Sequence, residues 1–581
     1  MRKTKIVCTL GPACSDIDTI RQLMLAGMNV ARFNFSHADH NAHKDLFEKL
    51  LVVREELKMP VASLLDTKGP EVRVGKMKDG KVTLIQGNSF ILTTDEMEGT
   101  SEKCTISYKD LPKDVKPGTS IMLDNGLIAL EVNKIEGNDI YCTICNGGEL
   151  SDHKGVNIPN TTLSMPYVSE KDRDDIIFGI EMGYDFIAAS FSRTADDILQ
   201  IRRILEEYKC NSINIIAKIE NAEGVLNVDE ILKVADGLMV ARGDMGVEIA
   251  LEEIPVIQKQ LIKKAYNAGK QVITATQMLE SMMVNPRPTR AETNDVANAI
   301  YDGTSAIMLS GETAAGKYPV ESVKTMARIA ERTERDIDYV KRFRTRDADE
   351  QNTVTSAISH ATCTTGHDLG AAAIITVTKS GQTARAISKY RPKCPIIGCT
   401  TSQNICRQLN LSWGVYPILV DEQTNTDQLF DHAVARAVQE GLVNNGDLVV
   451  ITAGAPLGIS GTTNLLKVHI VGDVLVSGKG VNQHSLCARL CVCSTEEEAL
   501  ERFTDGDILV IPATSNRLLG IIKKASGIVT EEMGVNSHAA IVGLTLDIPV
   551  IVGATNATKI LKNGSTAVLD SARGQVCSGH K

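Results

Sequence analysis

Charged side chains follow two apolar segments between residues 213 and 246. IIAKIE ends in Lys218 and Glu220, and the next apolar segment, GLMVAR, is followed by Asp244. Residues two apart on a strand point to the same side, so the lysine and the glutamate should share a face. Two carboxylates could hold Mg²⁺, and the ammonium could meet negative charge on a substrate. The alternative is a set of ion pairs at the rim of a sheet, although charges that converge at strand ends more often mark a site.

Polar residues also end other apolar segments. Arg32, in NVARFNFSH, suits bidentate contacts with phosphate or carboxylate, although a lone arginine is more often a salt-bridge partner. Thr276 follows another segment, where a hydroxyl could hold or donate a proton. Oxygen-bearing side chains near Arg32 could ligate a hard cation or simply form rim hydrogen bonds: Asn34, Ser36, Asp66 and Thr67.

A regular alternation of strands and helices positions these residues. Strands expected at 5–10, 29–35 and 61–66 are separated by helical patterns, which is typical of parallel βα units. Five more follow residue 160: DFIAASF, IIAKIE, GLMVAR, QVITAT and SAIMLS. Eight strands over 1–71 and 160–345 predict an α/β fold, a (β/α)₈ TIM barrel, with its active site at the carboxyl ends of the strands.

Three further domains are expected. Residues 72–159 have short alternating strands, and Asp124-Asn125-Gly126 is a strong hairpin signal, which predicts an inserted all-β domain. A charged linker, 341–352, leads to an α/β domain at 346–473. Residues 474–581 repeat the alternation of strand and helix and predict an extra C-terminal α/β domain.

Composition excludes several functional classes. A net charge of −10, one Trp and few other aromatics argue against binding nucleic acid or an anionic membrane. No apolar run is long enough to cross a membrane, and the first residues do not form a signal peptide. Fourteen cysteines then indicate a reducing compartment, hence the cytoplasm, with most thiols as apolar fillers. On strands, Cys142 and Cys145 would face opposite sides, whereas Cys491 and Cys493 would share one.

Two loops could carry further chemistry. The segment TKSGQT, residues 378–383, joins a predicted strand to a predicted helix, and its backbone N–H groups could cradle a phosphate. The alternative is an ordinary strand-to-helix turn. The phosphate-binding residues would be Thr378, Lys379, Ser380, Gly381 and Thr383. His538 opens another probable helix, where a capping histidine is the favoured interpretation.

Residues 1–472 resemble the pyruvate kinase family. The matching motifs appear in the family's order: ARFNFSH, LLDTKGPEVR, KGVNIP, AKIENAEG, ARGDMGVE, ITATQMLESM, PRPTRAE and MLSGETAAGKYPVE. Residues 474–581 resemble the swivelling phosphohistidine domain of phosphoenolpyruvate-utilising enzymes, but Met533 and Asn536 depart from its GGxTSHAA motif. The chain also shows no nucleotide-grasp domain to charge a histidine, so a structural or regulatory role is expected for this domain.

The resemblance implies phosphate transfer from phosphoenolpyruvate to ADP, giving pyruvate and ATP in the last step of glycolysis. Glu220 and Asp244 would bind Mg²⁺ or Mn²⁺, while Lys218 and Arg32 would face the transferring group. The resemblance also implies that K⁺ is bound by Asn34, Ser36, Asp66 and Thr67. Gly243 and Thr276 would bind the substrate carboxylate, and Thr276 would also belong to a proton relay. The nucleotide would be bound by Asn34, Arg73 and Lys154.

The resemblance also concerns regulation and assembly. Glu71 matches the potassium-requiring members, and residues 72–159 would close as a lid that excludes water. A sugar-phosphate or nucleotide effector would bind at 378–383, and the family is usually homotetrameric. Two alternatives stay open from the residues alone: a barrel lyase or aldolase that uses Mg²⁺ to stabilise an enolate, and a phosphate carrier centred on His538.

Overall fold

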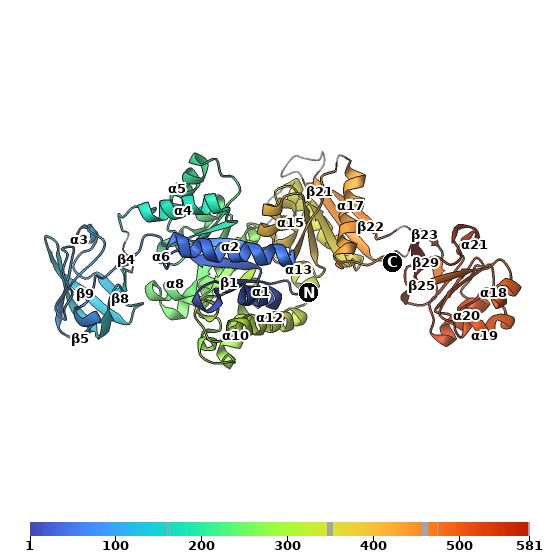
Figure 1. The fold of residues 1–581 in the computed structure, drawn as a ribbon, viewed down its shortest axis with the longest axis horizontal. Helices are drawn as coiled ribbons and strands as arrows, with labels where there is room; N and C mark the ends of the chain where they lie inside the picture. Colours follow the sequence, from blue (N-terminus) through green and yellow to red (C-terminus); the bar gives the residue numbers. More distant parts are fainter. Residues whose placement is uncertain are drawn as a thin grey trace. The chain divides into compact units, whose positions relative to one another are not determined.

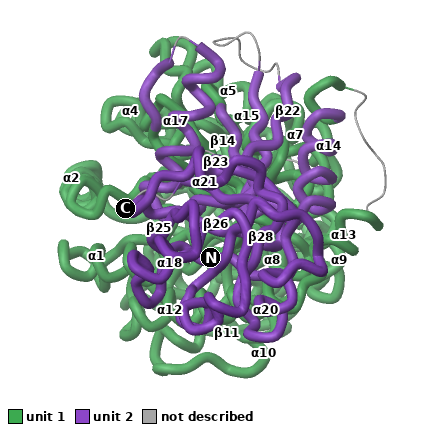
Figure 2. Tube along the Cα trace, turned by 90° about the vertical axis from the view of Figure 1, so that its right-hand side faces the viewer, with its two compact units in different colours: residues 1–356, 378–419 green, residues 357–377, 420–581 purple. Residues whose placement is uncertain are grey.

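A computed structural model describes residues 1–159, 161, 163–345, 353–423, 425–454, 463–472 and 474–578. The chain forms two compact units, residues 1–356 with 378–419 and residues 357–377 with 420–581 (Figure 2). None of the described helices combines the length and apolar character needed to cross a membrane. The expected domain boundaries at residues 160, 346 and 473 fall outside the described residues.

Eight parallel strands close into a barrel, with order β1-β17-β16-β15-β14-β13-β3-β2, so the predicted (β/α)₈ barrel is confirmed. Their bounds are β1 Lys5–Thr9, β2 Val30–Asn34, β3 Ala62–Asp66, β13 Phe186–Ala189, β14 Asn214–Ile219, β15 Gly237–Ala241, β16 Gln271–Ala275 and β17 Ala306–Leu309. The strands are buried almost throughout because helices cover the outside of the barrel, which explains their continuous apolar runs (Figure 1).

The covering helices start and stop where the sequence provides caps. Asp16 caps α1 by accepting a hydrogen bond from Thr19 N, and Gly27 ends it at φ 123°. Thr194 and Asp197 form a reciprocal capping box at the start of α5. The longer helices of the barrel are α1 Ile17–Ala26, α2 His40–Leu57, α4 Glu170–Met182, α5 Ala195–Glu207, α9 Ile254–Asn267, α10 Arg290–Asp302 and α12 Pro319–Asp336. The shorter ones are α6 Ala222–Leu226, α7 Val228–Val234, α8 Arg242–Glu248 and α11 Gly311–Ala314.

Side chains fill the barrel interior. Val7, Phe186, Ile216 and Met239, from four different strands, belong to one buried cluster. Leu411, fully buried, is part of the same cluster although it lies outside the barrel sequence. The barrel is therefore a packed core, to which a distant segment of the chain contributes.

The insert is an all-β domain, as expected. Asp124, Asn125 and Gly126 all have φ between 49° and 84° and turn β8 into its antiparallel partner β9. Its seven-stranded sheet has the order β4-β12-β8-β9-β10-β6-β7, beside the pair β5–β11. The bounds are β4 Val72–Arg73, β5 Lys81–Leu84, β6 Ser89–Thr93, β7 Lys103–Thr105, α3 Leu111–Asp114, β8 Ser120–Leu123, β9 Ile128–Glu136, β10 Asp139–Asn146, β11 Gly148–Ser151 and β12 Gly155–Asn157.

The first residues of the expected charged linker are helical. α13, Tyr339–Arg344, forms there because the side chain of Asp338 accepts a hydrogen bond from Lys341 N. Residues 346–352 of the linker lie outside the described ranges.

The next part of the chain alternates helices and strands, and the predicted α/β domain is confirmed. β19 pairs with β20 in parallel in the first unit; in the second, β18 pairs with β21 in parallel and β21 with β22 antiparallel. The elements are α14 Val354–Asp368, β18 Ala373–Val377, α15 Gln382–Ser388, β19 Ile396–Thr400, α16 Gln403–Leu409, β20 Val415–Leu419, α17 Thr426–Gln439, β21 Leu448–Gly454 and β22 Thr463–Ile470.

The C-terminal α/β domain is also confirmed, with sheet order β23-β30-β29-β25-β26-β27-β28-β24. Cys491, in β25, and Cys493, just after β25, have their Sγ atoms 3.6 Å apart, whereas in the inserted domain Cys142 is buried and Cys145 exposed. The elements are β23 Val474–Ser477, β24 Lys479–Gly480, β25 Ser485–Val492, α18 Glu496–Arg502, β26 Ile508–Ile511, α19 Leu519–Ile522, β27 Gly527–Thr530, α20 His538–Leu546, β28 Val550–Val552, α21 Ala557–Ile560, β29 Thr566–Asp570 and β30 Gln575–Ser578.

Candidate active site

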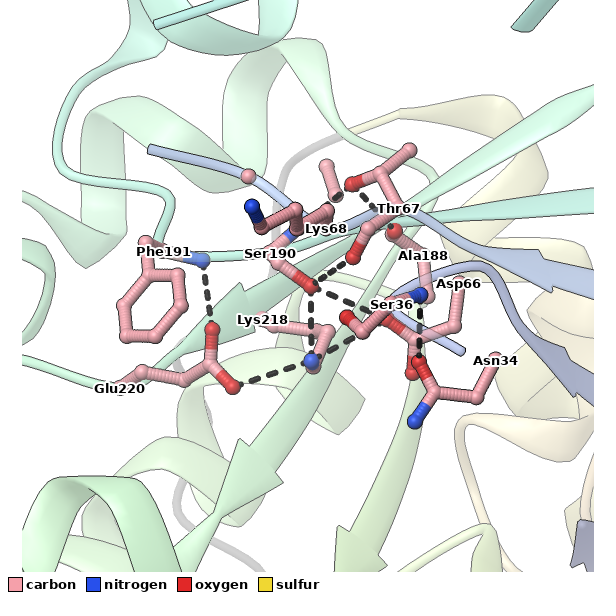
Figure 3. Close-up of polar contacts among 12 residues, drawn as sticks. Asn34, Ser36, Asp66, Thr67, Lys68, Ala188, Ser190, Phe191, Lys218 and Glu220 are labelled. Atoms are coloured by element: carbon pink, nitrogen blue, oxygen red, sulfur yellow. Dashed lines mark hydrogen bonds and ion pairs between the residues drawn. The ribbon is translucent and has the colours of Figure 1, made fainter. Parts of the chain in front are cut away.

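Lys218 is the centre of a buried polar cluster at the carboxyl ends of the barrel strands (Figure 3). Its Nζ lies 3.0 Å from Glu220 Oε1 and 3.1 Å from Asp66 Oδ1, and it donates a hydrogen bond of 2.7 Å to Ser190 Oγ. The lysine and the glutamate therefore share a face of β14, as their spacing predicts. The three charged side chains come from β3, β14 and the residue after β14, so barrel closure brings them together.

Burial and mutual attraction compete in this cluster. Burial alone would lower the pKa of Lys218, but Asp66 and Glu220 outweigh it and raise the pKa. Burial also raises the pKa of Glu220, which Lys218 opposes and Asp244 reinforces. The Asp66 carboxyl is buried as well, yet Arg32 and Lys218 hold its pKa below the usual value. The lysine is thus a fixed cation, while Glu220 gains most from a further positive charge.

Arg32 binds the same aspartate from the other side. Its Nε lies 2.5 Å from Asp66 Oδ2, and its Nη1 donates to Thr9 Oγ1 at 2.9 Å. Asp66 therefore holds two cations, one on each oxygen. Arg32 thus forms a salt bridge in this structure, and the salt bridge fixes the guanidinium on the aspartate that also binds Lys218.

Asp244 supplies a second carboxylate for a cation. It lies in the first turn of α8 and lines a cavity, and its side chain forms no hydrogen bond or ion pair with any part of the chain that the structure describes. Its charge raises the pKa of Glu220, so a cation between the two carboxylates would relieve their repulsion. No three His, Cys, Asp or Glu side chains converge within the described ranges. These donors fit Mg²⁺, which is usually held by one or two carboxylates and completed by water or substrate oxygens.

The predicted potassium ligands lie at the ends of β2 and β3. Asn34 and Asp66 are register partners, and Asn34 Oδ1 accepts a hydrogen bond from Ser36 N at 3.2 Å (Figure 3). Thr67 Oγ1 donates to Ala188 O at 3.2 Å and accepts from Ser190 N. The set is one carboxylate among neutral oxygens, which fits a hard monovalent cation, but Asp66 is already shared by Arg32 and Lys218.

Thr276, which follows β16, lies beside Gly243 in the first turn of α8. Gly243 N donates to Thr276 Oγ1 at 2.8 Å, and Thr276 adopts a left-handed φ of 68°. Arg242 holds this strained turn, since its Nη2 donates to Thr276 O at 2.5 Å while its Nη1 pairs with Asp295 at 2.6 Å. The turn presents the threonine hydroxyl at the carboxyl end of β16.

The residues expected to bind nucleotide have other partners here. Arg73 forms a two-point ion pair with Glu71 at 2.7 and 2.8 Å, and Lys154 lies 2.8 Å from Asp124. Neither has a hydrogen bond or ion pair with the Lys218 cluster among the described residues. A nucleotide phosphate would have to displace Glu71 and Asp124.

A cavity of about 400 Å³ lies between the inserted domain and the barrel. Glu71, Asn125 and Asn157 line one side, and Asp244 and Glu248 line the other. Burial raises the pKa of Glu248 to about 7, although a hydrogen bond from Asn157 opposes this and Asp244 adds to it. The cavity therefore reaches one of the two candidate metal ligands.

Several contributors have weak signals in the sequence. Ser190 donates to Asp66 Oδ1 at 3.0 Å and accepts from Lys218, so it bridges the two charges. Phe191 N donates to Glu220 Oε2 at 2.5 Å. The polar Ser190 after the apolar run DFIAA is a signal that could have identified it, whereas the backbone contact of Phe191 has none.

The two other loops form as strand-to-helix connections. Gly381 has φ 79°, a left-handed backbone conformation that favours glycine, so another residue would strain the turn at 378–383. Ser537, not His538, caps α20, because its hydroxyl accepts from Ala540 N, which corrects the capping-histidine interpretation. The two ring nitrogens of His538 lie 2.9 Å from Thr514 Oγ1 and 3.1 Å from Asn516 Oδ1.

Comparisons with known proteins agree along the chain. Family models match as "Pyruvate kinase, barrel domain" at residues 1–323, "Pyruvate kinase, alpha/beta domain" at 356–469 and "PEP-utilising enzyme, mobile domain" at 503–574. Pyruvate kinases of Geobacillus stearothermophilus and Bacillus licheniformis are 52% and 49% identical over 581 residues, covering 100% of this chain and 99% of each relative. A crystal structure of a pyruvate kinase from Cryptosporidium parvum has a TM-score of 0.77 and 39% identity, covering 81% of this chain and 96% of its own.

Proposed function

Because the chain belongs to the pyruvate kinase family, a family of phosphotransferases, we propose that the Lys218 cluster carries out Mg²⁺- and K⁺-dependent phosphoryl transfer between phosphoenolpyruvate and ADP. The observation that carries this assignment is the position of Lys218 Nζ, 3.0 Å from Glu220 and 3.1 Å from Asp66, at the mouth of the barrel. This arrangement places a permanent cation beside Glu220, which is one of the two carboxylates proposed to hold the divalent metal.

Glu220 and Asp244 would hold the divalent ion, which would neutralise charge on substrate oxygens. Glu220 is fixed for this task because Phe191 N binds its second oxygen. Metal ligation requires the deprotonated carboxylate, so the raised pKa of Glu220 makes binding of the ion weaken as pH falls.

Lys218 and Arg32 stabilise the charge that develops as the phosphoryl group leaves the enolate oxygen. Both are held on the oxygens of Asp66, so little reorganisation is needed when the substrate binds. Loss of the phosphoryl group leaves an enolate, and its carbon must gain a proton to give pyruvate. Thr276 supports that transfer from the turn that Arg242 holds, and Gly243 N–H, now bound to Thr276, would meet the substrate carboxylate.

The inserted domain, residues 72–159, acts as a lid. Arg73 and Lys154 exchange their present carboxylate partners for nucleotide phosphates, with Asn34 also contacting the nucleotide, and the cavity between lid and barrel accommodates it. Closure excludes water, which protects the phosphoryl group from hydrolysis.

Family membership supports the remaining assignments, which are part of the proposal. K⁺ binds at Asn34, Ser36, Asp66 and Thr67, beside the cations on Asp66. Residues 346–473 form the effector domain, where a sugar phosphate or nucleotide binds at Thr378, Lys379, Ser380, Gly381 and Thr383. Residues 474–581 have a structural or regulatory role. The enzyme is a cytoplasmic homotetramer.

A coupled assay for pyruvate tests the reaction and its metals together. The full-length protein is given phosphoenolpyruvate and ADP with Mg²⁺ and K⁺, and then each metal is removed in turn or K⁺ is replaced by a tetraalkylammonium ion. Pyruvate and ATP in equal amounts are expected only with both metals present. Unchanged turnover without K⁺ would remove the potassium assignment, and no turnover with both metals would refute the proposed reaction.

A further inference from the structure

A second, smaller cavity lies at the opposite end of the barrel from Lys218. Lys270 and Gln271, where β16 begins, and Ser305, just before β17, form one wall. Helix α15 and the residues after it form the other wall. Its volume is about 10 Å³, which is room for about one water-sized particle. The cavity thus joins two barrel strands to the segment that follows the loop at 378–383.

Cationic side chains dominate the lining of this cavity. Lys270, Arg385, Lys389 and Arg391 all line it, and among the described residues no aspartate or glutamate does. In the described part of the chain, Lys270 and Arg385 form no ion pair. The acid that acts on both, Asp236, is engaged by Arg202 at 2.8 Å. The positive charge is therefore not balanced by carboxylates of the lining.

Neutral groups give these cations only partial compensation. Lys270 Nζ donates to Ala235 O at 2.8 Å, and Arg385 Nη2 donates to Ser380 O at 3.1 Å. Arg385 Nη1 is buried and makes no hydrogen bond to any residue within the described ranges. Burial lowers the pKa of both groups, so keeping them charged is costly. An anion nearby would offset that cost.

The wall of the cavity is organised in advance. Arg391 is held at a left-handed φ of 51°, and it donates to Ser388 O at 2.6 Å and to Gly303 O at 3.0 Å. Its guanidinium carbon lies 4.9 Å from the ring centroid of Trp413. Ser305 and Ser412 use their hydroxyl oxygens as acceptors, so each retains a hydrogen to donate. Fixed cations with two hydroxyl donors are suited to a small anion.

We propose that this cavity binds one monovalent inorganic anion of the size of chloride, contacted by three cationic side chains of the lining and one hydroxyl: Lys270, Arg385, Lys389 and Ser412. Its volume favours a single atom over a tetrahedral oxyanion such as phosphate. The bound ion fastens the beginning of β16 to α15. Because β16 leads directly to Thr276, the anion stabilises the strand that carries this threonine, far from the substrates themselves.

The test compares anions while the cation stays constant. Thermal unfolding of the full-length protein is followed in sodium chloride and in sodium gluconate, with total sodium fixed, because gluconate is too large for the cavity. The variants are Lys270→Met and Lys389→Met, and the matched control is Lys324→Met, which removes an exposed lysine from α12. We expect chloride to raise the melting temperature of the wild type by about 2 °C or more, in a saturable manner, because a ligand that binds only the folded state stabilises it.

The same rise is expected in Lys324→Met, and its loss in Lys270→Met and Lys389→Met. Equal melting in the two salts, or an unchanged chloride effect in both cavity variants, would overturn the proposal. Crystals grown with bromide in place of chloride give an independent measurement if a variant does not fold. An anomalous peak between Lys270 and Ser412 supports the site, and a water without anomalous signal there overturns it. A stabilisation by phosphate but not by chloride would overturn the assignment by size.

Discussion

Replacing Lys218 with methionine is the sharpest perturbation of the proposed active site. Methionine preserves much of the apolar stem but removes the ammonium that lies 3.0 Å from Glu220, 3.1 Å from Asp66 and 2.7 Å from Ser190. Asp66 keeps Arg32 at 2.5 Å, whereas Glu220 keeps only its hydrogen bond from Phe191 N and the nearby charge of Asp244. The substitution therefore leaves one carboxylate poorly compensated.

The magnitude can be worked from these contacts. Removing one preorganised group that stabilises transition-state charge costs about 10²–10³ in kcat, roughly 3–4 kcal/mol. Lys218 is also the direct partner of Glu220, so we expect a loss at the upper end of this range or beyond. Breaking a buried ion pair by removing one partner costs about 3–5 kcal/mol of folding free energy, which Mg²⁺ bound at Glu220 and Asp244 should partly restore.

The assay separates chemistry from folding. Pyruvate formation is measured at saturating phosphoenolpyruvate, ADP, Mg²⁺ and K⁺, and urea unfolding is measured with and without Mg²⁺. Ser190→Ala is the matched control, because it removes a hydrogen bond to Lys218 but no charge, and a smaller loss of kcat is expected. Turnover of Lys218→Met within tenfold of the wild type, in a folded protein, would refute the assigned role of the ammonium.

Four further predictions concern stability and the outlying domains. Because the pKa of Glu248 is raised to about 7, the folded protein keeps a proton between pH 4.5 and 7 that the unfolded chain has lost. The free energy of unfolding should therefore fall as pH rises through this window. Urea unfolding of Glu248→Gln at several pH values should show a smaller fall. Burial lowers the pKa of Lys5 to about 7, with Arg2 adding to the effect and Glu334 opposing it. Between pH 7 and 10.5 the unfolded chain holds a proton that the folded protein has lost, so the free energy of unfolding should rise with pH there. Lys5→Met should remove that rise in urea unfolding. Leu411→Ala should cost about 2–5 kcal/mol by urea unfolding, because it opens a void in the barrel interior, and a cost below 1 kcal/mol would contradict its place in that core. Deleting residues 474–581 should leave phosphoryl transfer in the coupled assay, and a folded but inactive truncation would contradict this.

The sequence predicted the parts of the fold that depend on local pattern. Buried parallel strands must be apolar throughout, so KIVCTL, NVARFNF and VASLLD were recognisable, and β1, β2 and β3 begin and end within one residue of the expected bounds. The pairing of Lys218 with Glu220 followed from the two-residue period of a strand. The hairpin at residues 124–126 followed from turn chemistry. Each of these features is decided by residues close together in the chain.

The packing of distant segments decided the rest. Asp66 holds Arg32 and Lys218 at once because barrel closure places β2, β3 and β14 around one mouth, and no spacing within the sequence encodes that sharing. Leu411 enters the barrel core, and Arg391 lines the small cavity together with Lys270, only because the chain returns to the barrel well after the end of α12. Local periodicity thus determined which elements form and which ends are polar. The folded structure determines which of these polar ends form ion pairs with one another and which line the same cavity, because both depend on distances between residues that are far apart in the sequence.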